Sequence, residues 1–316
     1  YLNLLDMNAI HSIEVLKGPD GSLFGANSGG VVRLNAFPGD TTTKIRAGIG
    51  GGSYGLFNEY ISAKHQTGKN TIEITQAWQR SNGYRENSKL DRKYVQVTDQ
   101  FQYTDKGRLK LLLFYSNLHY QTPGGLTLQQ WTDTPWSARP GTATLPGAKE
   151  QKAAIYNSTF YGGISHEIKL NKKWSQLTAL FGSYTDFENP FITNYEVRRE
   201  NTLGARTWLQ ASNNQEGTIL VKFHLGAEAS TTNSDIKNYN NVFGQKGPVQ
   251  KFDIIYNNQL FIFSHLMFDF YNKWLLEGGL SLNVNQYSFY TTQPSETPKG
   301  KRSFVPQLMP KIAASY

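Results

Sequence analysis

The sequence predicts an all-β protein, organised as a transmembrane antiparallel β-barrel of which only part is present. Apolar and polar residues alternate over segments of about 10–14 residues, as from Ile219 to Ala229 and from Trp274 to Val284. Polar connections between such segments are short and long in turn. Tyr, Phe and Trp together form 13% of the 316 residues, as expected from aromatic belts at two membrane interfaces.

About eleven segments have this strand pattern. Most exceed the usual strand of about 5–6 residues and reach the roughly 9–11 residues that a tilted strand needs to cross a bilayer. The predicted strands are 44–63, 70–80, 93–104, 107–120, 153–168, 173–186, 202–212, 218–230, 251–271, 273–290 and 306–316.

The connections are of two kinds. Tight polar turns are predicted at 67–70, 104–107, 170–173 and 271–273, and long connections at 81–92, 121–152, 187–201 and 231–250. Short turns on one rim and long loops on the other are typical of outer-membrane barrels, whereas turns in a soluble sandwich are more evenly spaced. The pattern therefore favours a membrane barrel over a Tyr-rich, soluble carbohydrate-binding sandwich, which composition alone leaves open.

Composition and charge argue against several classes of protein and of binding site. The mean hydropathy is −0.50, and no apolar run approaches the roughly 20 residues of a membrane helix; a barrel tolerates this because only alternate residues face lipid. The chain has no cysteine, which rules out disulfides and thiolate metal sites. The net charge of +8 is scattered, so we expect no nucleic-acid partner. Positive loops would attract an anionic ligand or lipopolysaccharide phosphates.

The first 37 residues differ from the rest. Two short strand-like runs, 13–16 and 31–34, enclose a glycine-rich stretch with a strong turn signal at 18–21. A phosphate-binding loop is the alternative for this stretch, and the lack of a following Lys-Ser/Thr pair argues against it. In chain order, the stretch contains three short motifs: Ile13-Glu14-Val15-Leu16-Lys17-Gly18-Pro19, Ser22-Leu23-Phe24-Gly25 and Gly29-Gly30-Val31-Val32.

This run resembles the end of the plug domain of TonB-dependent outer-membrane receptors, and the resemblance rests on Glu14, Lys17, Gly18, Pro19, Gly25, Gly29 and Gly30. More weakly, 50–55 resembles the opening strand just after such a plug, and 120–127 and 138–141 are similar to receptors of the ferric-citrate type. The resemblance implies a C-terminal plug part over 1–38 and the N-terminal half of a barrel over 39–316, with about 11 of the family's 22 strands. The chain is then expected to be a fragment that begins inside the plug and ends inside the barrel.

The resemblance further implies uptake of a ferric chelate (ferric citrate or a siderophore) across the outer membrane of a Gram-negative bacterium. The plug would gate transport, and the TonB–ExbB–ExbD complex would energise it through a segment upstream of residue 1. The iron chelate would be cargo, and no cofactor is expected. Other cargo, such as an oligosaccharide or vitamin B12, stays open, as does a porin or adhesin without a plug, although 13–34 argues against the latter.

Candidate ligand-binding residues are arginines and aromatics of the long connections: Arg85, Trp131, Trp136, Arg139, Tyr195, Arg198 and Arg199, with Arg206 on the strand that follows. The planar guanidinium suits carboxylates, and aromatic rings offer flat surfaces to a chelate. Solvated loop charges or lipopolysaccharide contacts are the alternative. Glu14 and Lys17 are expected to pair with the barrel lining.

No enzyme is predicted. The six histidines show no HExxH spacing, and the acidic residues form no evident pair. The sequence therefore indicates neither a catalytic site nor a metal site.

Overall fold

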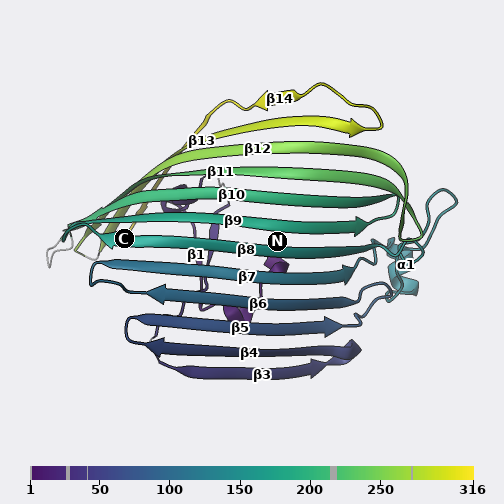
Figure 1. The fold of residues 1–316 in the computed structure, drawn as a ribbon, viewed down its shortest axis with the longest axis horizontal. Helices are drawn as coiled ribbons and strands as arrows, with labels where there is room; N and C mark the ends of the chain where they lie inside the picture. The colour runs from purple at the N-terminus through teal and green to yellow at the C-terminus, as the bar shows by residue number, and fades with distance from the viewer. Residues whose placement is uncertain (1, 26–28, 41, 214–218, 272) are drawn as a thin grey trace.

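The computed structural model describes residues 2–25, 29–40, 42–213, 219–271 and 273–316. Residues 44–315 form one antiparallel sheet whose strands are paired in chain order from β3 to β13 (Figure 1), with β14 and β15 both on the far side of β13. The strands are β3 (Lys44–Gly52), β4 (Leu56–Thr67), β5 (Asn70–Ser81), β6 (Leu90–Phe101), β7 (Gly107–Gln121), β8 (Ala154–Lys169), β9 (Trp174–Pro190), β10 (Asn194–Ser212), β11 (Ile219–Val242), β12 (Gln245–Phe270), β13 (Trp274–Gln293), β14 (Gly300–Ser303) and β15 (Gln307–Ser315).

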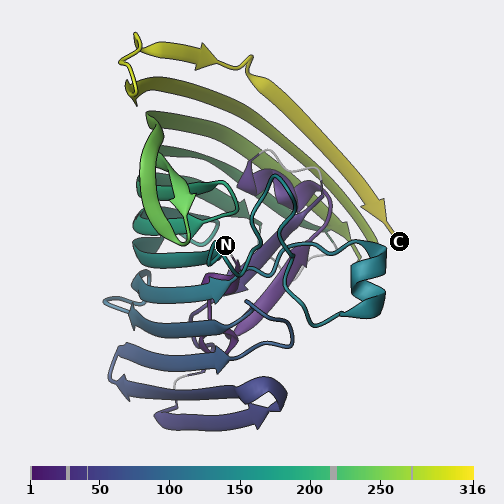
Figure 2. The same ribbon diagram turned by 90° about the vertical axis from the view of Figure 1, so that its right-hand side faces the viewer.

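The sheet is strongly curved, and the N-terminal segment (residues 2–40) lies on its concave side (Figure 2). We call this concave side the inner face. The segment contains η1 (Leu2–Leu4), η2 (Met7–Ala9), β1 (Ser12–Leu16), η3 (Pro19–Phe24) and β2 (Val31–Asn35). Strands β1 and β2 form a separate antiparallel pair. The sheet itself is open, since β3 and β14–β15 are its two edges.

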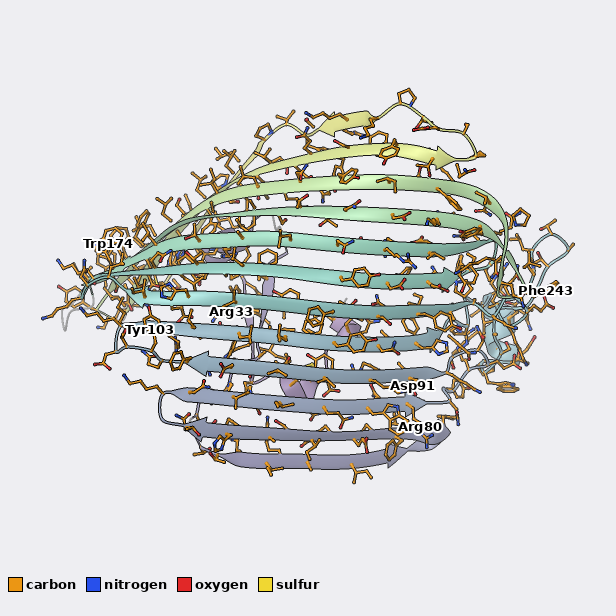
Figure 3. All side chains as sticks on the ribbon, viewed as in Figure 1. Arg33, Arg80, Asp91, Tyr103, Trp174 and Phe243 are labelled. Atoms are coloured by element: carbon orange, nitrogen blue, oxygen red, sulfur yellow. The ribbon has the colours of Figure 1, made fainter. Side chains whose placement is uncertain are left out.

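Alternation along the strands explains the two faces of the sheet. On β12, Phe263 and His265 face inward and are almost fully buried, whereas Leu260, Ile262 and Leu266 face outward and are exposed. The outer face is therefore apolar over the middle of the strands. Aromatic side chains such as Tyr103 and Trp174 lie at the end of the sheet that carries the short turns (Figure 3). The prediction of a partial antiparallel barrel is confirmed.

The predicted strand 44–63 is wrong, because it is two strands. β3 and β4 are a hairpin joined by η4 (Ser53–Gly55), and Gly52 pairs with Leu56. Tyr54 and Gly55 both have positive φ, 59° and 64°, which turns the chain tightly. The three residues before the turn are glycines, and because they have no side chains the apolar–polar alternation gives no sign of where β3 ends.

The predicted long connections 187–201 and 231–250 are also wrong. β9 ends at Pro190 and β10 begins at Asn194, while β11 and β12 are joined only by Phe243 and Gly244. These stretches are largely paired strand extensions in which Asn and charged residues are frequent. Because both faces of such an extension are polar, the alternation that marks a strand in the sequence is missing. The long connections between β5 and β6 and between β7 and β8, the latter including α1 (Leu128–Asp133), are confirmed.

The last predicted strand, 306–316, corresponds to β15. Both β14 and β15 pair with β13, one after the other along its length. The tight turns at 67–70, 104–107 and 170–173 are confirmed, because each joins two neighbouring strands. Asn272 of the predicted turn 271–273, residue 218 of the predicted strand 218–230, and residues 26–28 inside the motif lie outside the described residues. Within the described ranges, no helix has the length and apolar character needed to cross a membrane.

Candidate functional site

The motif residues build a hairpin with a short helix at its tip. Gly30 has a φ of +108°, and a Cβ there would lie 2.8 Å from the carbonyl oxygen of Leu16, so the position requires glycine. Gly18 and Gly25 flank η3 and also have positive φ, and Pro19 is the first residue of that helix. Gly29 has open space around it. The hairpin geometry thus accounts for most of the motif.

The expected pairing of Glu14 with the barrel lining is wrong. Glu14 and Arg33 face each other across β1 and β2, and their side chains form an ion pair of 2.6 Å that is about half exposed. Lys17 lies beside Gly30 in the same hairpin. The contacts between the N-terminal segment and the sheet come from other residues.

The first of these contacts centres on Glu73 of β5. This carboxylate is 4% exposed and lies 2.6 Å from His11 Nε2 of the N-terminal segment. Arg46 and the Ser62 hydroxyl of the neighbouring strands also donate to it, at 2.9 and 2.7 Å. Charge-assisted hydrogen bonds of this kind are the strong ones in proteins. They hold the start of β1 against β3, β4 and β5.

A second contact holds η1 and η2. Arg92 of β6 donates to the carbonyl oxygen of Leu5 at 2.7 Å and forms an ion pair with Asp6 at 2.6 Å. On the same strand, the Gln96 side-chain amide donates to the carbonyl oxygen of Ala9 at 2.9 Å. The backbone of the N-terminal segment is therefore bonded directly to inner-face side chains.

The third contact is made by Arg206 of β10, which was predicted as a ligand-binding residue. Its guanidinium pairs with Glu228 of β11 at 2.9 Å and donates to the carbonyl oxygen of Leu23 in η3. Four aromatic rings surround it with centroids 4.8–5.9 Å away, namely Phe24, Trp208, Phe261 and Phe263. Arg206 therefore lies in an aromatic cage that fixes the tip of the motif hairpin.

Arg85 and Arg139 brace the loops in which they lie. Arg85 donates through two nitrogens to the carbonyl oxygen of Ser137, at 2.9 and 3.0 Å, and Arg139 donates to the carbonyl oxygen of Pro146. Nearby, the Lys149 ammonium, 2.9 Å from Glu86, lowers the pKa of that carboxyl, and the Ala138 N–H contributes as well. The loops 82–89 and 122–153 are thus bound to each other.

Trp131 in α1 and Trp136 in the following turn are 61% and 53% exposed. They offer free aromatic surface at the loop end of the sheet, the end where the connections 82–89 and 122–153 lie (Figure 1). A ligand-binding role for the two tryptophans stays a prediction, as it does for Arg85 and Arg139.

Tyr195, Arg198 and Arg199 belong to β10 rather than to a loop. Arg198 lies eight residues before the inward-facing Arg206 in an unbroken register, so it faces inward, and its guanidinium lies over the Phe187 ring. Arg199 must then face outward. Tyr195 is buried and donates to Glu188. The two arginines therefore cannot form one site.

Gln151, which was not predicted from the sequence, links loop 122–153 to neighbouring hairpins at the loop end of the sheet. Its side-chain amide donates to the carbonyl oxygens of Ile192 and Asn241, at 2.8 and 3.1 Å, and its oxygen accepts from the N–H of Phe243. Asn241 donates back to the Gln151 carbonyl at 2.9 Å. Loop 122–153 is thereby bonded to the tips of two hairpins. Only the fold brings these residues together, since Gln151 and Asn241 are 90 positions apart.

Replacing Gln151 by alanine should loosen this junction. The substitution leaves two carbonyls and one N–H without their partners, and a buried unsatisfied group costs about 1–3 kcal/mol. We expect faster hydrogen exchange at Phe243 and earlier proteolytic cleavage at 243–244. Gln129→Ala is the matched control, because Gln129 is an exposed loop glutamine paired only with Asp133. Equal exchange in both variants would contradict the assignment.

A cleft of about 500 Å³ lies beside the tip of η3, between the N-terminal segment and the last strands. This size is within the range of small-molecule sites. Its lining mixes aromatic and amide side chains with one carboxylate, and includes Phe24, Glu228, Gln259, Phe261, Asn283 and Tyr287. It opens on the inner face next to the Arg206 cage.

No family model matches the sequence. The structure is similar to the ferric citrate transporter FecA, with a TM-score of 0.81 at 13% identity, covering 98% of this chain and 48% of that one. It is also similar to the ferripyoverdine receptor of the Pseudomonas aeruginosa outer membrane (TM-score 0.77, 14% identity, 98% and 45% covered). The siderophore receptor PiuA from Acinetobacter baumannii matches with a TM-score of 0.75 at 12% identity, covering 98% and 52%. The chain therefore has the fold of the TonB-dependent ferric citrate and siderophore receptors, and it spans about half the length of these solved chains.

Proposed function

We propose that this chain is part of a TonB-dependent outer-membrane receptor that takes up a ferric chelate. In this proposal the sheet is the first half of the barrel, and the N-terminal segment is the end of a plug that gates it. The receptor works without covalent chemistry, and the TonB–ExbB–ExbD complex supplies the energy. The iron chelate is its cargo.

The observation that carries the proposal is the way in which the N-terminal segment is held. Glu73, Arg92 and Arg206 bind it through ion pairs and hydrogen bonds. Water can replace such bonds, so that their net contribution is only about 0.5–3 kcal/mol each. The buried apolar contact of the segment with the sheet includes a small cluster in which Ala9 packs on Ala77 and Tyr94. A segment held by polar contacts and such a small apolar cluster is displaced more readily than one packed by an extensive apolar interface. This is what a gate requires.

The loop end supports capture of an anion. The inner face there carries Arg198 over Phe187, and two exposed tryptophans lie on the adjoining loop. A guanidinium and aromatic planes suit a citrate- or siderophore-bound ferric ion. On the outer face Arg199 lies instead on the side proposed to meet lipopolysaccharide. Cargo and lipid are thus assigned to opposite faces of the same strand.

Uptake of radioactive iron by cells tests the proposal. The intact protein is produced in a strain that lacks its own ferric chelate receptors, and uptake of ferric citrate and of several siderophores is measured with and without TonB. We expect TonB-dependent uptake of at least one ferric chelate. Uptake of vitamin B12 or an oligosaccharide alone would contradict the cargo, and solute entry independent of TonB would indicate a porin.

The position of the two arginines gives a matched pair of variants. If the chelate binds on the inner face, Arg198→Ala should weaken its binding by roughly 10- to 100-fold, since a hydrogen bond to a charged group contributes about 1.5–3 kcal/mol. Arg199→Ala should leave the affinity unchanged. Isothermal titration calorimetry with the preferred chelate measures both. Equal losses, or none for Arg198, would remove Arg198 from the site.

A further inference from the structure

Asp20, His265 and Glu277 converge where the N-terminal segment meets the sheet. His265 Nε2 lies 3.3 Å from an Asp20 oxygen and 3.5 Å from a Glu277 oxygen. Asp20 comes from η3, His265 from β12 and Glu277 from β13. In the part of the chain that the structure describes, this is the one cluster of three such ligand groups, with all three ligand atoms within 4.8 Å of one another.

The sheet register and the packing of η3 together build the cluster. His265 pairs with His224 on one side and with Gly279 on the other. A Cβ on Gly279 would lie 2.4 Å from the Ser22 hydroxyl and 2.6 Å from the carbonyl oxygen of Pro19. The missing side chain therefore lets η3 rest directly on β13, which carries Asp20 to the neighbouring Glu277.

The environment of the His265 ring is a second, independent indication of a bound ligand. The residue is 2% exposed, yet neither ring nitrogen has a hydrogen-bond partner. The two carboxylates lie beside Nε2 without hydrogen-bond geometry. The ring of His224 is 5.8 Å from that of His265, and its Nδ1 is also buried without a hydrogen-bond partner. Buried polar groups are rarely left unpaired, so a cation coordinated between these side chains would satisfy the site.

We propose that Asp20, His265 and Glu277 bind a divalent transition metal ion of the zinc class, which ties η3 to the sheet. One imidazole nitrogen and two carboxylate oxygens suit such an ion better than Mg²⁺ or Ca²⁺, which prefer oxygen alone. Bonds of about 2.0–2.2 Å in a tetrahedron place neighbouring ligand atoms roughly 3.3–3.6 Å apart. The two separations that involve His265 Nε2, 3.3 and 3.5 Å, fall at this spacing, and the two carboxylate oxygens lie within 4.8 Å of each other.

The metal would act as a clamp between the N-terminal segment and the sheet. Asp20 is the sole ligand from the segment, whereas His265 and Glu277 belong to adjacent, hydrogen-bonded strands. Lifting η3 would therefore break one metal bond and leave two. This inference does not rest on iron uptake, because it depends only on the contact between η3 and the sheet.

Metal binding to the intact protein, purified in detergent and stripped with a chelator, tests the inference. Co²⁺ is titrated at pH 7.5, followed by its visible absorption, and Zn²⁺ is used to displace it. We expect one equivalent of tightly bound Co²⁺ with a tetrahedral spectrum. Asp20→Asn, His265→Gln and Glu277→Gln should each weaken binding by about 100-fold or more, since loss even of a supporting outer-shell group costs about 10–100-fold.

His166→Gln is the matched control, because His166 also lies in a strand but bonds to the Tyr103 hydroxyl, away from the cluster. Asp20→Asn keeps the sheet intact, since Asp20 is about half exposed on η3. Zn²⁺ should slow hydrogen exchange at residues 19–24 in the wild type but not in Asp20→Asn. Absence of saturable binding, binding unchanged in His265→Gln, or exchange unaffected by Zn²⁺ would each overturn the clamp.

Discussion

Replacing Arg206 by alanine should release the tip of the motif hairpin from the inner face. The substitution removes the bond to the carbonyl oxygen of Leu23 and leaves Glu228 unpaired. Truncating one partner of a hydrogen-bonded buried charge pair costs about 2–5 kcal/mol. The lower part of that range applies here, because the Glu228 side chain is 23% exposed. Collapse of the surrounding aromatic cage adds to the loss.

The effect is measured in two ways on the intact protein in detergent. Hydrogen exchange at Leu23 and Phe24 should accelerate by roughly 30-fold or more, and the midpoint of thermal unfolding should fall. The double variant Arg206→Met, Glu228→Gln should recover much of the stability, since no unpaired charge remains. Arg199→Ala, on the outer face of the same strand, is the matched control. If Arg206→Ala exchanges like that control, the guanidinium does not hold η3.

Much of this fold is predictable because a curved sheet with one apolar face imposes a period of two on the sequence. The alternation from Ile219 to Ala229 and from Trp274 to Val284 predicted strands that the structure confirms as parts of β11 and β13. Tight polar turns such as 104–107 then predicted which strands pair. Neighbouring antiparallel strands joined by short turns leave little freedom in the topology.

The strand extensions at the loop end escaped prediction for a physical reason. Residues 194–200 and 234–240 pair with each other in unbroken register, but they carry many amide and charged side chains, such as Asn194, Arg199 and Asp235. Backbone hydrogen bonds alone define such a strand, and they leave no trace in side-chain polarity. Composition therefore indicated loops where there are paired strands.

The same error affected the candidate site. In a loop over 187–201, Arg198 and Arg199 form one basic group, but neighbours in a strand point to opposite faces. The contacts that hold the N-terminal segment were not predictable from spacing either. His11 meets Glu73 across 62 positions, and Arg206 meets Leu23 across 183. The one sequence feature that could have indicated these contacts is a polar residue at an inward-facing position of a predicted strand.

Replacing Gly279 by valine should push η3 away from β13. The first atom of the new side chain would lie 2.4 Å from the Ser22 hydroxyl and 2.6 Å from the carbonyl oxygen of Pro19. Neither neighbour can yield easily, because Ser22 is fully buried and the other atom belongs to the backbone. Overpacking of this kind costs about 1–3 kcal/mol. The ratio of docked to undocked η3 should fall by roughly five- to 150-fold.

Gly278→Val is the matched control, because the adjacent Gly278 faces outward and a Cβ there meets nothing within 4 Å. Hydrogen exchange at residues 19–24 should accelerate in Gly279→Val and stay at the wild-type rate in Gly278→Val. Since the displaced η3 also carries Asp20, Co²⁺ binding should weaken in the first variant only. Wild-type exchange in Gly279→Val would mean that η3 does not rest on β13. Faster exchange with unchanged metal binding would separate the docking of η3 from the clamp and remove Asp20 from the ligand set.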